Sequence, residues 1–302
     1  MAKRTVHVFQ IDVFTTEMFA GNPAGVVLGA ERLSEAEMQA LARELNNSDS
    51  AFVLPPDGPD HDVKLRFFTP TREVGFVGHA SVAAHVARLA AGQGKVGKLR
   101  QKVRTGIYDV EVSGSAATPR VSVAIPAPEF QPAISADTRA RLLDIFGIDT
   151  AALDPKCPVV VTKRTSTRLM IGLRSADLLA SLQPNLEELK RMTPHVGADG
   201  YFLFVRDARG PGTTESRLFS PVLGIPEDPV SGNAHGMLGA YLVANGLLPL
   251  ADGRGRFRGY QGRSVLRPGE VDVEVLTEAG IPSRILMSGT ARVVFTTEIT
   301  LD

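Results

Sequence analysis

Two glycine-led segments, Gly78-His79 and Gly232-Asn233, carry groups that could do chemistry, and each stands before a run of mostly apolar residues. Such a run predicts a buried helix, whose first turn presents unpaired backbone amides and the positive end of the helix dipole. A helix start of this kind suits a carboxylate. His79 could also exchange protons near neutral pH, although a single histidine can equally be structural.

Asp228 and Ser231 lie in the loop that leads to the second of these helix starts. Asp228 stands between a glutamate and a proline, so we interpret it as part of a constrained loop aimed at the helix start. Small residues at positions 231–233 would let a ligand approach the backbone closely. Both side chains could instead cap the helix, and capping is compatible with ligand binding.

Asp49 and Asn22 are polar residues in two further connecting segments. Asp49 stands among small polar residues between an expected helix and an expected strand, where a carboxylate could simply cap a turn. Asn22 falls in a turn expected over residues 21–25 and precedes Pro23, which favours an extended backbone that can direct the amide into a cleft. A purely structural turn is the alternative for Asn22.

The two helix starts have similar lead-in sequences, which indicates an internal duplication. Residues 66–70 read Arg-Phe-Phe-Thr-Pro and residues 217–221 read Arg-Leu-Phe-Ser-Pro. Further upstream, residues 47–53 precede the first of these segments by about the same distance as residues 197–203 precede the second. Several matches in one order favour duplication over chance and predict two domains.

The elements that must position these residues follow from periodicity and capping signals. Ser34 and Glu37 form a capping box, which predicts a helix start there. Helices are expected over residues 34–45, 78 to about 92, 137–146, 175–182, 186–192 and 232 to about 245. Strands are expected over residues 6–14, 26–28, 51–54, 63–68, 103–112, 120–125, 158–162, 168–173, 201–205, 254–259, 271–276, 284–286 and 291–296.

Prolines at positions 126 and 128 mark the expected domain boundary. The predicted domains are residues 1–127, which the last strand at about 288–302 is a candidate to complete, and residues 128–287. The length of 302 residues also favours two domains.

Composition narrows the class of ligand to small molecules. The 33 basic and 33 acidic residues balance, so no charge excess favours nucleic acid or an anionic membrane. No apolar run is long enough to span a membrane, and the first residues read as a strand, so a cytoplasmic location is expected. Cys157 is the single cysteine, and His79 and His85 lack metal-motif spacing, so no disulfide and no metal or other cofactor is expected.

Read together, several motifs in both halves resemble the PhzF family of phenazine-biosynthesis-like isomerases. The motifs are Phe19-Ala20-Gly21-Asn22-Pro23-Ala24, Ser48-Asp49-Ser50-Ala51-Phe52-Val53, Phe68-Thr69-Pro70, Gly78-His79-Ala80 and residues 224–234, which read Gly-Ile-Pro-Glu-Asp-Pro-Val-Ser-Gly-Asn-Ala. The resemblance implies an α+β, diaminopimelate-epimerase-like fold with two pseudo-symmetric domains. Each domain would be a mainly antiparallel sheet or open barrel around a central helix, with the active site between the domains.

The same resemblance implies cofactor-independent proton transfer at carbon, and family members are often homodimers. The family's acid/base glutamate falls on Asp49, and its histidine and aspartate fall on His79 and Asp228. Asn233 stands where a small hydroxyl residue is common, and it cannot relay a proton as a hydroxyl can. The epimerase relatives use a cysteine at each helix start, so His79 and Asn233 exclude a two-thiol racemase here.

These observations predict an isomerase or epimerase that acts on a small carboxylate-bearing, amino-acid-like or cyclic substrate. Asp49 would be the general base and acid, with His79 and Asp228 orienting the substrate and tuning the proton transfer. The amides around Gly78 and Gly232 would hold a substrate carboxylate. Asn22, Ser231 and Asn233 complete the expected substrate-binding set. The alternatives are a non-catalytic small-molecule binding or interaction protein on the same fold, and a dehydratase that uses the same proton abstraction.

Overall fold

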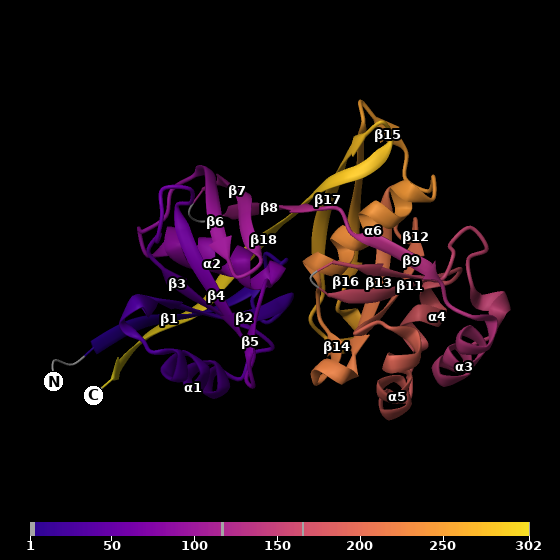
Figure 1. Ribbon diagram of the computed structural model, residues 1–302, viewed down its shortest axis with the longest axis horizontal. Helices are drawn as coiled ribbons and strands as arrows, with labels where there is room; N and C mark the ends of the chain where they lie inside the picture. Colours follow the sequence, from indigo (N-terminus) through magenta and orange to yellow (C-terminus); the bar gives the residue numbers. More distant parts are fainter. Residues whose placement is uncertain (1–3, 116–117, 165, 302) are drawn as a thin grey trace. The chain divides into compact units, whose positions relative to one another are not determined.

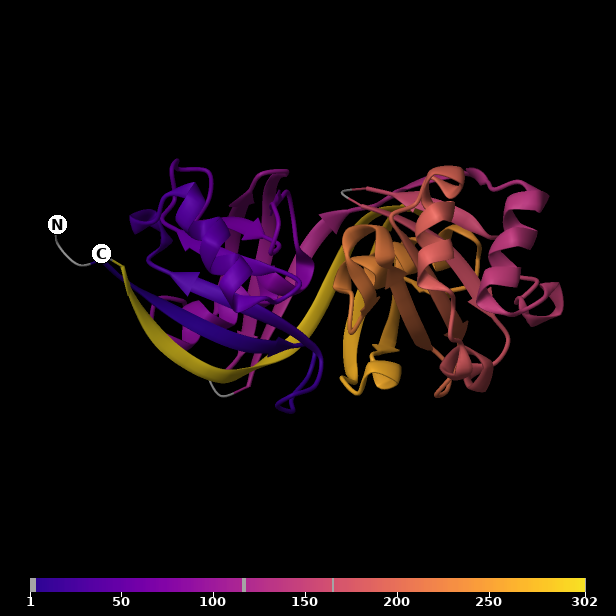
Figure 2. The same cartoon turned by 90° about the horizontal axis from the view of Figure 1, so that it is seen from below.

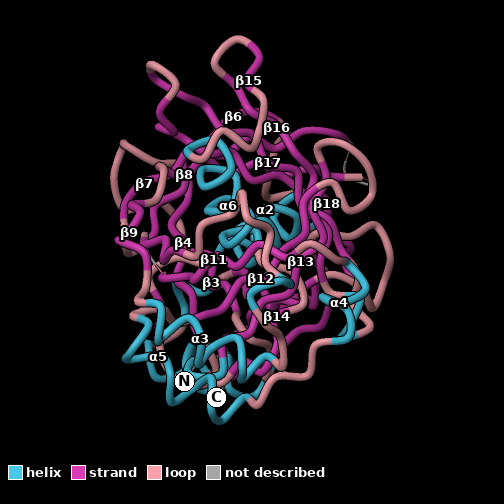
Figure 3. Tube along the Cα trace, turned by 90° about the vertical axis from the view of Figure 1, so that its right-hand side faces the viewer, coloured by secondary structure: helices cyan, strands magenta, loops and turns pink. Residues whose placement is uncertain are grey.

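The computed structural model describes residues 4–115, 118–164 and 166–301 of the chain, and these form two compact units. Unit 1 comprises Met1–Ile125 together with Ser288–Asp302, and unit 2 comprises Pro126–Met287. Figures 1 and 2 show a mainly stranded architecture with one central helix, α2 or α6, in each unit. Strands carry more of the described chain than helices do, as Figure 3 shows by colour.

Unit 1 is a sheet whose pairings run in a closed ring. The order is β1, β2, β3, β4, β6, β7, β8, β18 and back to β1. The β2–β3 and β4–β6 pairs are parallel, and β1–β2, β3–β4, β6–β7, β7–β8 and β1–β18 are antiparallel. The strands are β1 (Arg4–Val13), β2 (Asn22–Leu28), β3 (Ser50–Leu54), β4 (Val63–Phe68), β5 (Glu73–Val74), β6 (Gly97–Val103), β7 (Gly106–Gly114), β8 (Pro119–Pro126) and β18 (Ile281–Leu301).

Helix α2 (Gly78–Ala90) packs against the strands of unit 1 and is buried from Gly78 to Ala87. Alanines and valines dominate this helix, and Ser81 and His85 have a buried hydrogen-bond partner in Gln101, so burial on nearly every side is possible. The second helix, α1 (Glu35–Leu45), is amphipathic and packs Met38 and Leu41 on valine and phenylalanine side chains of the sheet. Ser34 and Glu37 form the predicted capping box at its start.

Unit 2 repeats this plan with additional helices. Its strands are β9 (Glu129–Ala133), β10 (Val160–Lys163), β11 (Thr167–Leu173), β12 (Gly200–Arg206), β13 (Thr213–Ser220), β14 (Ile225–Asp228), β15 (Leu250–Ala251), β16 (Arg254–Gln261) and β17 (Gly269–Glu278). Its helices are α3 (Ala136–Phe146), α4 (Ala176–Ser181), α5 (Leu186–Val196) and α6 (Gly232–Ala244). The short 3₁₀ helices of the chain are η1 (Ala30–Arg32), η2 (Thr150–Ala152), η3 (Pro221–Leu223) and η4 (Arg263–Val265).

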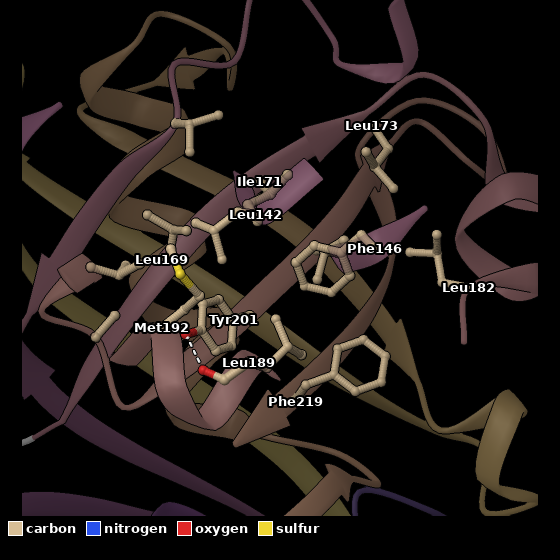
Figure 4. Packing of buried hydrophobic residues seen from close by; sticks show 14 of the residues in the cluster. Leu142, Phe146, Leu169, Ile171, Leu173, Leu182, Leu189, Met192, Tyr201 and Phe219 are labelled. Carbon is tan, nitrogen blue, oxygen red and sulfur yellow. Dashed lines mark hydrogen bonds between the residues drawn. The ribbon is translucent and has the colours of Figure 1, made fainter. Parts of the chain in front are cut away.

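Two layers of apolar packing hold unit 2 together. Helix α6 packs on β16 and β17, where Gly239 faces Val273 and Phe257. On the other layer, α3, α4 and α5 bury a cluster that includes Phe146, Leu189 and Phe219 against the sheet (Figure 4). Tyr201 lies in this cluster, and its hydroxyl donates to the Leu189 carbonyl at 2.7 Å.

The order of strand pairings in unit 2 matches that in unit 1, as the duplication predicts. In unit 1, β2 pairs parallel with β3, β3 antiparallel with β4, β4 parallel with β6, and β6 antiparallel with β7. In unit 2, β11, β12, β13, β16 and β17 pair in the same order with the same directions. The predicted α+β class with two related domains of mainly antiparallel sheet around a central helix is therefore confirmed.

Several expected elements differ from the structure. The turn predicted over residues 21–25 is wrong, because β2 already begins at Asn22, which pairs with Val13. Gly21 alone has a positive φ there, of 60°, and a side chain on it would collide with the Val13 carbonyl oxygen. The turn is therefore limited to Gly21, and residues 22–25 of the predicted turn belong to the buried strand β2.

The strand predicted over residues 103–112 is confirmed over residues 106–112, which belong to β7, but its start is misplaced, because residues 104–105 form the turn between β6 and β7. Strand β6 was missed because lysine and arginine alternate with its buried residues, and the segment up to residue 98 resembles a solvated loop. The strands expected at 284–286 and 291–296 are one continuous strand, β18, in which Gly289 packs against the Phe14 ring. No helix among the described residues is both long enough and apolar enough to cross a membrane.

Candidate active site

The start of helix α2 in unit 1 is a buried helix end without a side-chain cap. Val77 occupies the N-cap position, its extended backbone begins the helix, and its side chain makes no capping hydrogen bond. Ser81 is the first residue whose amide reaches a carbonyl of the turn before it, that of Val77. The amides of Gly78, His79 and Ala80 precede it, so this end can donate hydrogen bonds to an anion, and the helix dipole favours negative charge there.

His79 lies in this first turn, beside Asp49. The Nε2 atom of His79 is 3.8 Å from Oδ2 of Asp49, and the two side chains are 8% and 14% exposed. That separation is too long for a hydrogen bond, and Nε2 is a buried atom with no hydrogen-bond partner. Burial lowers the pKa of His79 to about 4, so the imidazole is neutral at neutral pH.

Asp49 is placed by the chain that enters strand β3. Ser50 begins β3 and pairs with Gly25 on one side and with Phe68 on the other, which fixes the backbone next to Asp49. Two residues upstream, the amide of Asn47 exchanges two hydrogen bonds with the amide of Gln10, at 3.0 and 2.9 Å. The carboxylate thus projects from a connection that is anchored at both ends. The hydroxyl groups of Ser48 and Ser50 beside it are buried and make no hydrogen bond.

Asn22 is the first residue of β2, and its side chain is 1% exposed. Strand β2 packs directly against α2. Unit 1 therefore brings Asp49 and His79 together, with Gly78 at the same helix start and Asn22 on a strand that contacts this helix.

The start of helix α6 in unit 2 differs because it has a cap. Ser231 is the N-cap residue, and its hydroxyl accepts from the Ala234 amide at 3.3 Å. Capping by Ser231 is compatible with ligand binding, because the amides of Gly232 and Asn233 precede the first intrahelical hydrogen bond. The Asn233 side chain donates to the Ser166 hydroxyl at 2.8 Å, while its buried Oδ1 atom has no hydrogen-bond partner.

Asp228 is the last residue of β14, a short strand where a loop was expected. It pairs with Leu218 of β13, and its carbonyl oxygen accepts from the side chain of Gln261 at 2.6 Å. The carboxylate also lies close enough to the buried Arg168 to influence the pKa of that guanidinium. Burial lowers the pKa of Arg168, and the charges of Asp228 and Asp199 oppose that shift. Unit 2 therefore brings Asp228, Ser231, Gly232 and Asn233 to one helix start.

Arg168 and Gln261 are candidate site residues that sequence reasoning missed. Arg168 is 8% exposed, and its Nε atom has no hydrogen-bond partner. The repeat could have indicated it, because Arg168 pairs with Gly200 as Gly25 pairs with Ser50 in unit 1. A buried arginine in place of a glycine is costly and therefore conspicuous. Among the residues that the structure describes, no group of three or more His, Cys, Asp or Glu side chains could hold a metal ion.

Solved structures with this fold place the chain in a class of proteins. The PhzF-family phenazine biosynthesis protein of Bacillus anthracis superposes with a TM-score of 0.87 at 25% identity, over 99% of this chain and 100% of that one. A hydroxyproline epimerase of Agrobacterium vitis, at 12% identity, shares the fold alone, with a TM-score of 0.66 over 100% and 93% of the two chains. The two related units thus define the epimerase-like class of α+β folds.

Sequence comparisons then identify the family. A family model described as phenazine biosynthesis-like protein, PhzC-PhzF, matches residues 11–297. The uncharacterized isomerase YddE of Escherichia coli K12 is 37% identical over 98% of each chain. The trans-2,3-dihydro-3-hydroxyanthranilate isomerase of Pseudomonas fluorescens is 31% identical over 78% of this chain and 79% of the relative. The chain belongs to the PhzC/PhzF family, and it is an isomerase.

Proposed function

We propose that this isomerase moves a proton between carbon positions of a small carboxylate-bearing substrate, with Asp49 as the group that carries the proton. The observation that supports the proposal most directly is the pair formed by Asp49 and His79 at an uncapped, buried helix start. A carboxylate is the base, and the neighbouring imidazole is neutral. The helix start supplies donors for the charge that develops on the substrate.

The proposed reaction balances without an oxidant or a reductant. Asp49 takes a proton from a carbon next to an unsaturated or carboxylate-bearing group, and the electron pair of the broken C–H bond delocalises into that group. The protonated Asp49 then returns the proton to another carbon of the same molecule, on the face from which it was taken. The amides at the start of α2 stabilise the transient negative charge.

The neutral state of His79 gives it a specific part in this scheme. A neutral imidazole offers one donor and one acceptor, so it can hydrogen-bond the substrate without forming a charged pair with Asp49. Its free Nε2 atom is available for such a bond. The predicted role of His79, to orient the substrate and tune the proton transfer, is compatible with this geometry. Asp228 keeps the orienting role predicted for it.

The substrate class follows from the same groups and from a relative. Backbone amides at a helix start favour a carboxylate, and buried serine hydroxyls near Asp49 favour further polar groups on the ligand. The relative from Pseudomonas fluorescens is named for trans-2,3-dihydro-3-hydroxyanthranilate, a cyclic amino acid. We therefore propose cyclic or hydroxylated amino acids as the substrate class.

Deuterium incorporation from solvent tests the proposal. The protein is incubated in deuterium oxide with trans-2,3-dihydro-3-hydroxyanthranilate and with a panel of cyclic and hydroxylated amino acids, and products are followed by mass spectrometry and NMR. We expect deuterium at carbon with the wild type and a loss of roughly 1000-fold or more in Asp49→Asn. Asp144→Asn, an exposed aspartate on α3, is the matched control and should keep full activity.

Two other outcomes would contradict the proposal. Tight binding of these compounds without any exchange at carbon would favour a small-molecule binding protein. Exchange accompanied by loss of water from the substrate would favour a dehydratase.

A further inference from the structure

The side chain of Gln261, at the end of β16, holds both ends of the segment that joins Asp228 to helix α6. Its Nε2 atom donates to the Asp228 carbonyl oxygen at 2.6 Å, and its Oε1 atom accepts from the Ser231 amide at 3.1 Å. Gln261 is 1% exposed, so water does not compete for either bond. One amide therefore closes the short connection between the last residue of β14 and the N-cap of α6.

The flanks of this connection are held by other contacts. Glu227 receives two hydrogen bonds from Arg217, at 2.9 and 2.7 Å, which anchors β14 next to Asp228. On the far side, the Ser231 hydroxyl caps α6. Between these anchors stands Pro229, which has no amide hydrogen to donate. The side-chain amide of Gln261 bridges the segment between these anchors, from Asp228 to Ser231.

The backbone of β16 approaches the same connection closely. Gly262 has a φ of 92°, and a side chain on it would collide with the carbonyl oxygens of Arg267 and Pro229. Because the chain turns at a glycine here, Gln261 can reach both Asp228 and Ser231.

Unit 1 contains a buried glutamine with a different role. Gln101, on β6, is 0% exposed and bonds to the side chains of His85 and Ser81 within α2, at 2.9 and 3.2 Å. It contacts helix side chains, whereas Gln261 contacts the backbone on both sides of Pro229. Gln101 is therefore a matched control for the loss of a buried amide.

We propose that Gln261 is the positioning residue for Asp228, and that it fixes this carboxylate relative to the first turn of α6. The inference rests on the proposed function, in which Asp228 orients the substrate. Gln261 acts through Asp228 and Ser231. It sets the direction from which the Asp228 side chain leaves the backbone, and it sets where α6 begins.

The experiment measures the mobility of the segment and the kinetics of the enzyme separately. Hydrogen–deuterium exchange of the peptide covering residues 226–236 is compared in wild type, Gln261→Met and Gln101→Met. Because Met fills a similar volume but makes neither bond, we expect exchange on the order of tenfold faster in this peptide for Gln261→Met. Gln101→Met should leave the peptide unchanged.

The kinetic arm uses the deuterium-incorporation assay. For Gln261→Met we expect kcat to fall roughly 10- to 100-fold, because a misplaced orienting group costs that much, with a smaller change in KM. Gln261→Glu separates the two bonds, since a carboxylate still accepts from the Ser231 amide but cannot donate to Asp228. It should keep slow exchange at Ser231 and still lose kcat.

Unchanged exchange of residues 226–236 in Gln261→Met would overturn the inference. An unchanged kcat in a variant whose segment exchanges faster would overturn it as well. If the wild type shows no exchange at carbon with any tested substrate, the proposed function fails for that panel, and the exchange of residues 226–236 then decides the inference by itself.

Discussion

The Asp49 carboxylate and the His79 imidazole lie next to each other, but they do not form a salt bridge of the usual kind. Their closest atoms are 3.8 Å apart, and burial keeps the histidine neutral by lowering its pKa to about 4. The neutral His79 therefore places no positive charge beside the carboxylate. A base that must accept a proton benefits from this arrangement, because a full positive charge beside it would stabilise its ionised form and weaken it.

Lengthening Asp49 tests whether the site is built for the shorter carboxylate. Asp49→Glu moves the carboxylate by one methylene, toward the length that the family's glutamate would have. We expect activity to fall by roughly 10- to 100-fold, because the added methylene moves the carboxylate relative to His79, whose Nε2 atom lies 3.8 Å from the shorter side chain. Steady-state deuterium incorporation measures the loss, which should be smaller than that of Asp49→Asn. Equal or higher activity in Asp49→Glu would contradict this prediction.

Residues could be predicted where sequence places an unusual side chain at a helix start or a proline-bounded loop. His79 and Asp228 were predicted in that way, and Asp49 by family resemblance, and the role of each stays a prediction. Arg168 and Gln261 were not, because nothing local distinguishes a strand arginine or glutamine from a solvated one. Their importance depends on burial and on partners that are distant in sequence, such as Asp228, which is 33 residues from Gln261.

At the scale of elements, each of the two central helices contains a buried histidine near its middle or first turn. His85 in α2 and His235 in α6 are 2% and 0% exposed. The Nε2 atom of His85 lies 2.9 Å from Oε1 of Gln101, and that of His235 lies 3.1 Å from the Ser216 hydroxyl. Burial lowers the pKa of each to about 4, as it does for His79. These helices are therefore packed around neutral imidazoles.

Acid should destabilise the fold through these histidines. Each has a folded-state pKa near 4, below the value of about 6.5 expected when unfolded, so between these pH values the unfolded state binds more protons. The free energy of unfolding should thus rise from pH 4 to 6.5 and level off above, with each histidine contributing on the order of 3 kcal/mol. Urea unfolding followed by circular dichroism between pH 4.5 and 7.5 measures it.

His85→Gln should make this pH dependence shallower, because it removes one buried titrating group. His7→Gln is the matched control, since the His7 side chain is 55% exposed. A free energy of unfolding that stays constant from pH 7 to pH 5 would show that these imidazoles are not buried as described.

Elements with strong local signals were predicted well, and elements defined by distant pairing were not. The capping box at Ser34 and the mostly apolar run after Gly78 identify α1 and α2, because both signals are local in sequence. Strand β6 alternates charged with buried residues and needs its partners β4 and β7 to be recognised as a strand. Strand β14 was interpreted as a loop because Pro226 and Pro229 flank its polar end, yet pairing with β13 makes it extended.

At the scale of the molecule, the duplication extends to an arginine–glutamate ion pair. In unit 1, Arg66 on β4 binds Glu73 through two bonds of 2.8 Å and lies 5.1 Å from the Phe68 ring centroid. In unit 2, Arg217 on β13 binds Glu227 and lies 4.8 Å from the ring centroid of Phe219. The same ion pair therefore links a short strand, β5 or β14, to its neighbour, β4 or β13, in both units.

The second copy of this ion pair should matter more for stability. Arg217 also donates to the carbonyl oxygens of Leu179 and Leu182, at 3.0 and 2.7 Å, so its loss leaves several buried acceptors unpaired. We expect Arg217→Met to lower the free energy of unfolding by about 3–5 kcal/mol. Arg66→Met, at a more exposed pair, should cost about 1–2 kcal/mol. Scanning calorimetry compares the two variants, and equal losses would contradict the prediction.

Strand β18 determines which of the two units can complete its sheet first during synthesis. The ring of unit 1 closes only when β18 lies between β1 and β8, and β18 is the last strand in sequence order. During translation β1 to β8 emerge first, yet their ring stays open until the ribosome has released the last strand. Unit 2, whose residues end at Met287, can be finished earlier. The half that is synthesised first is therefore the half that closes last, and its unpaired β1 and β8 edges stay exposed for most of synthesis.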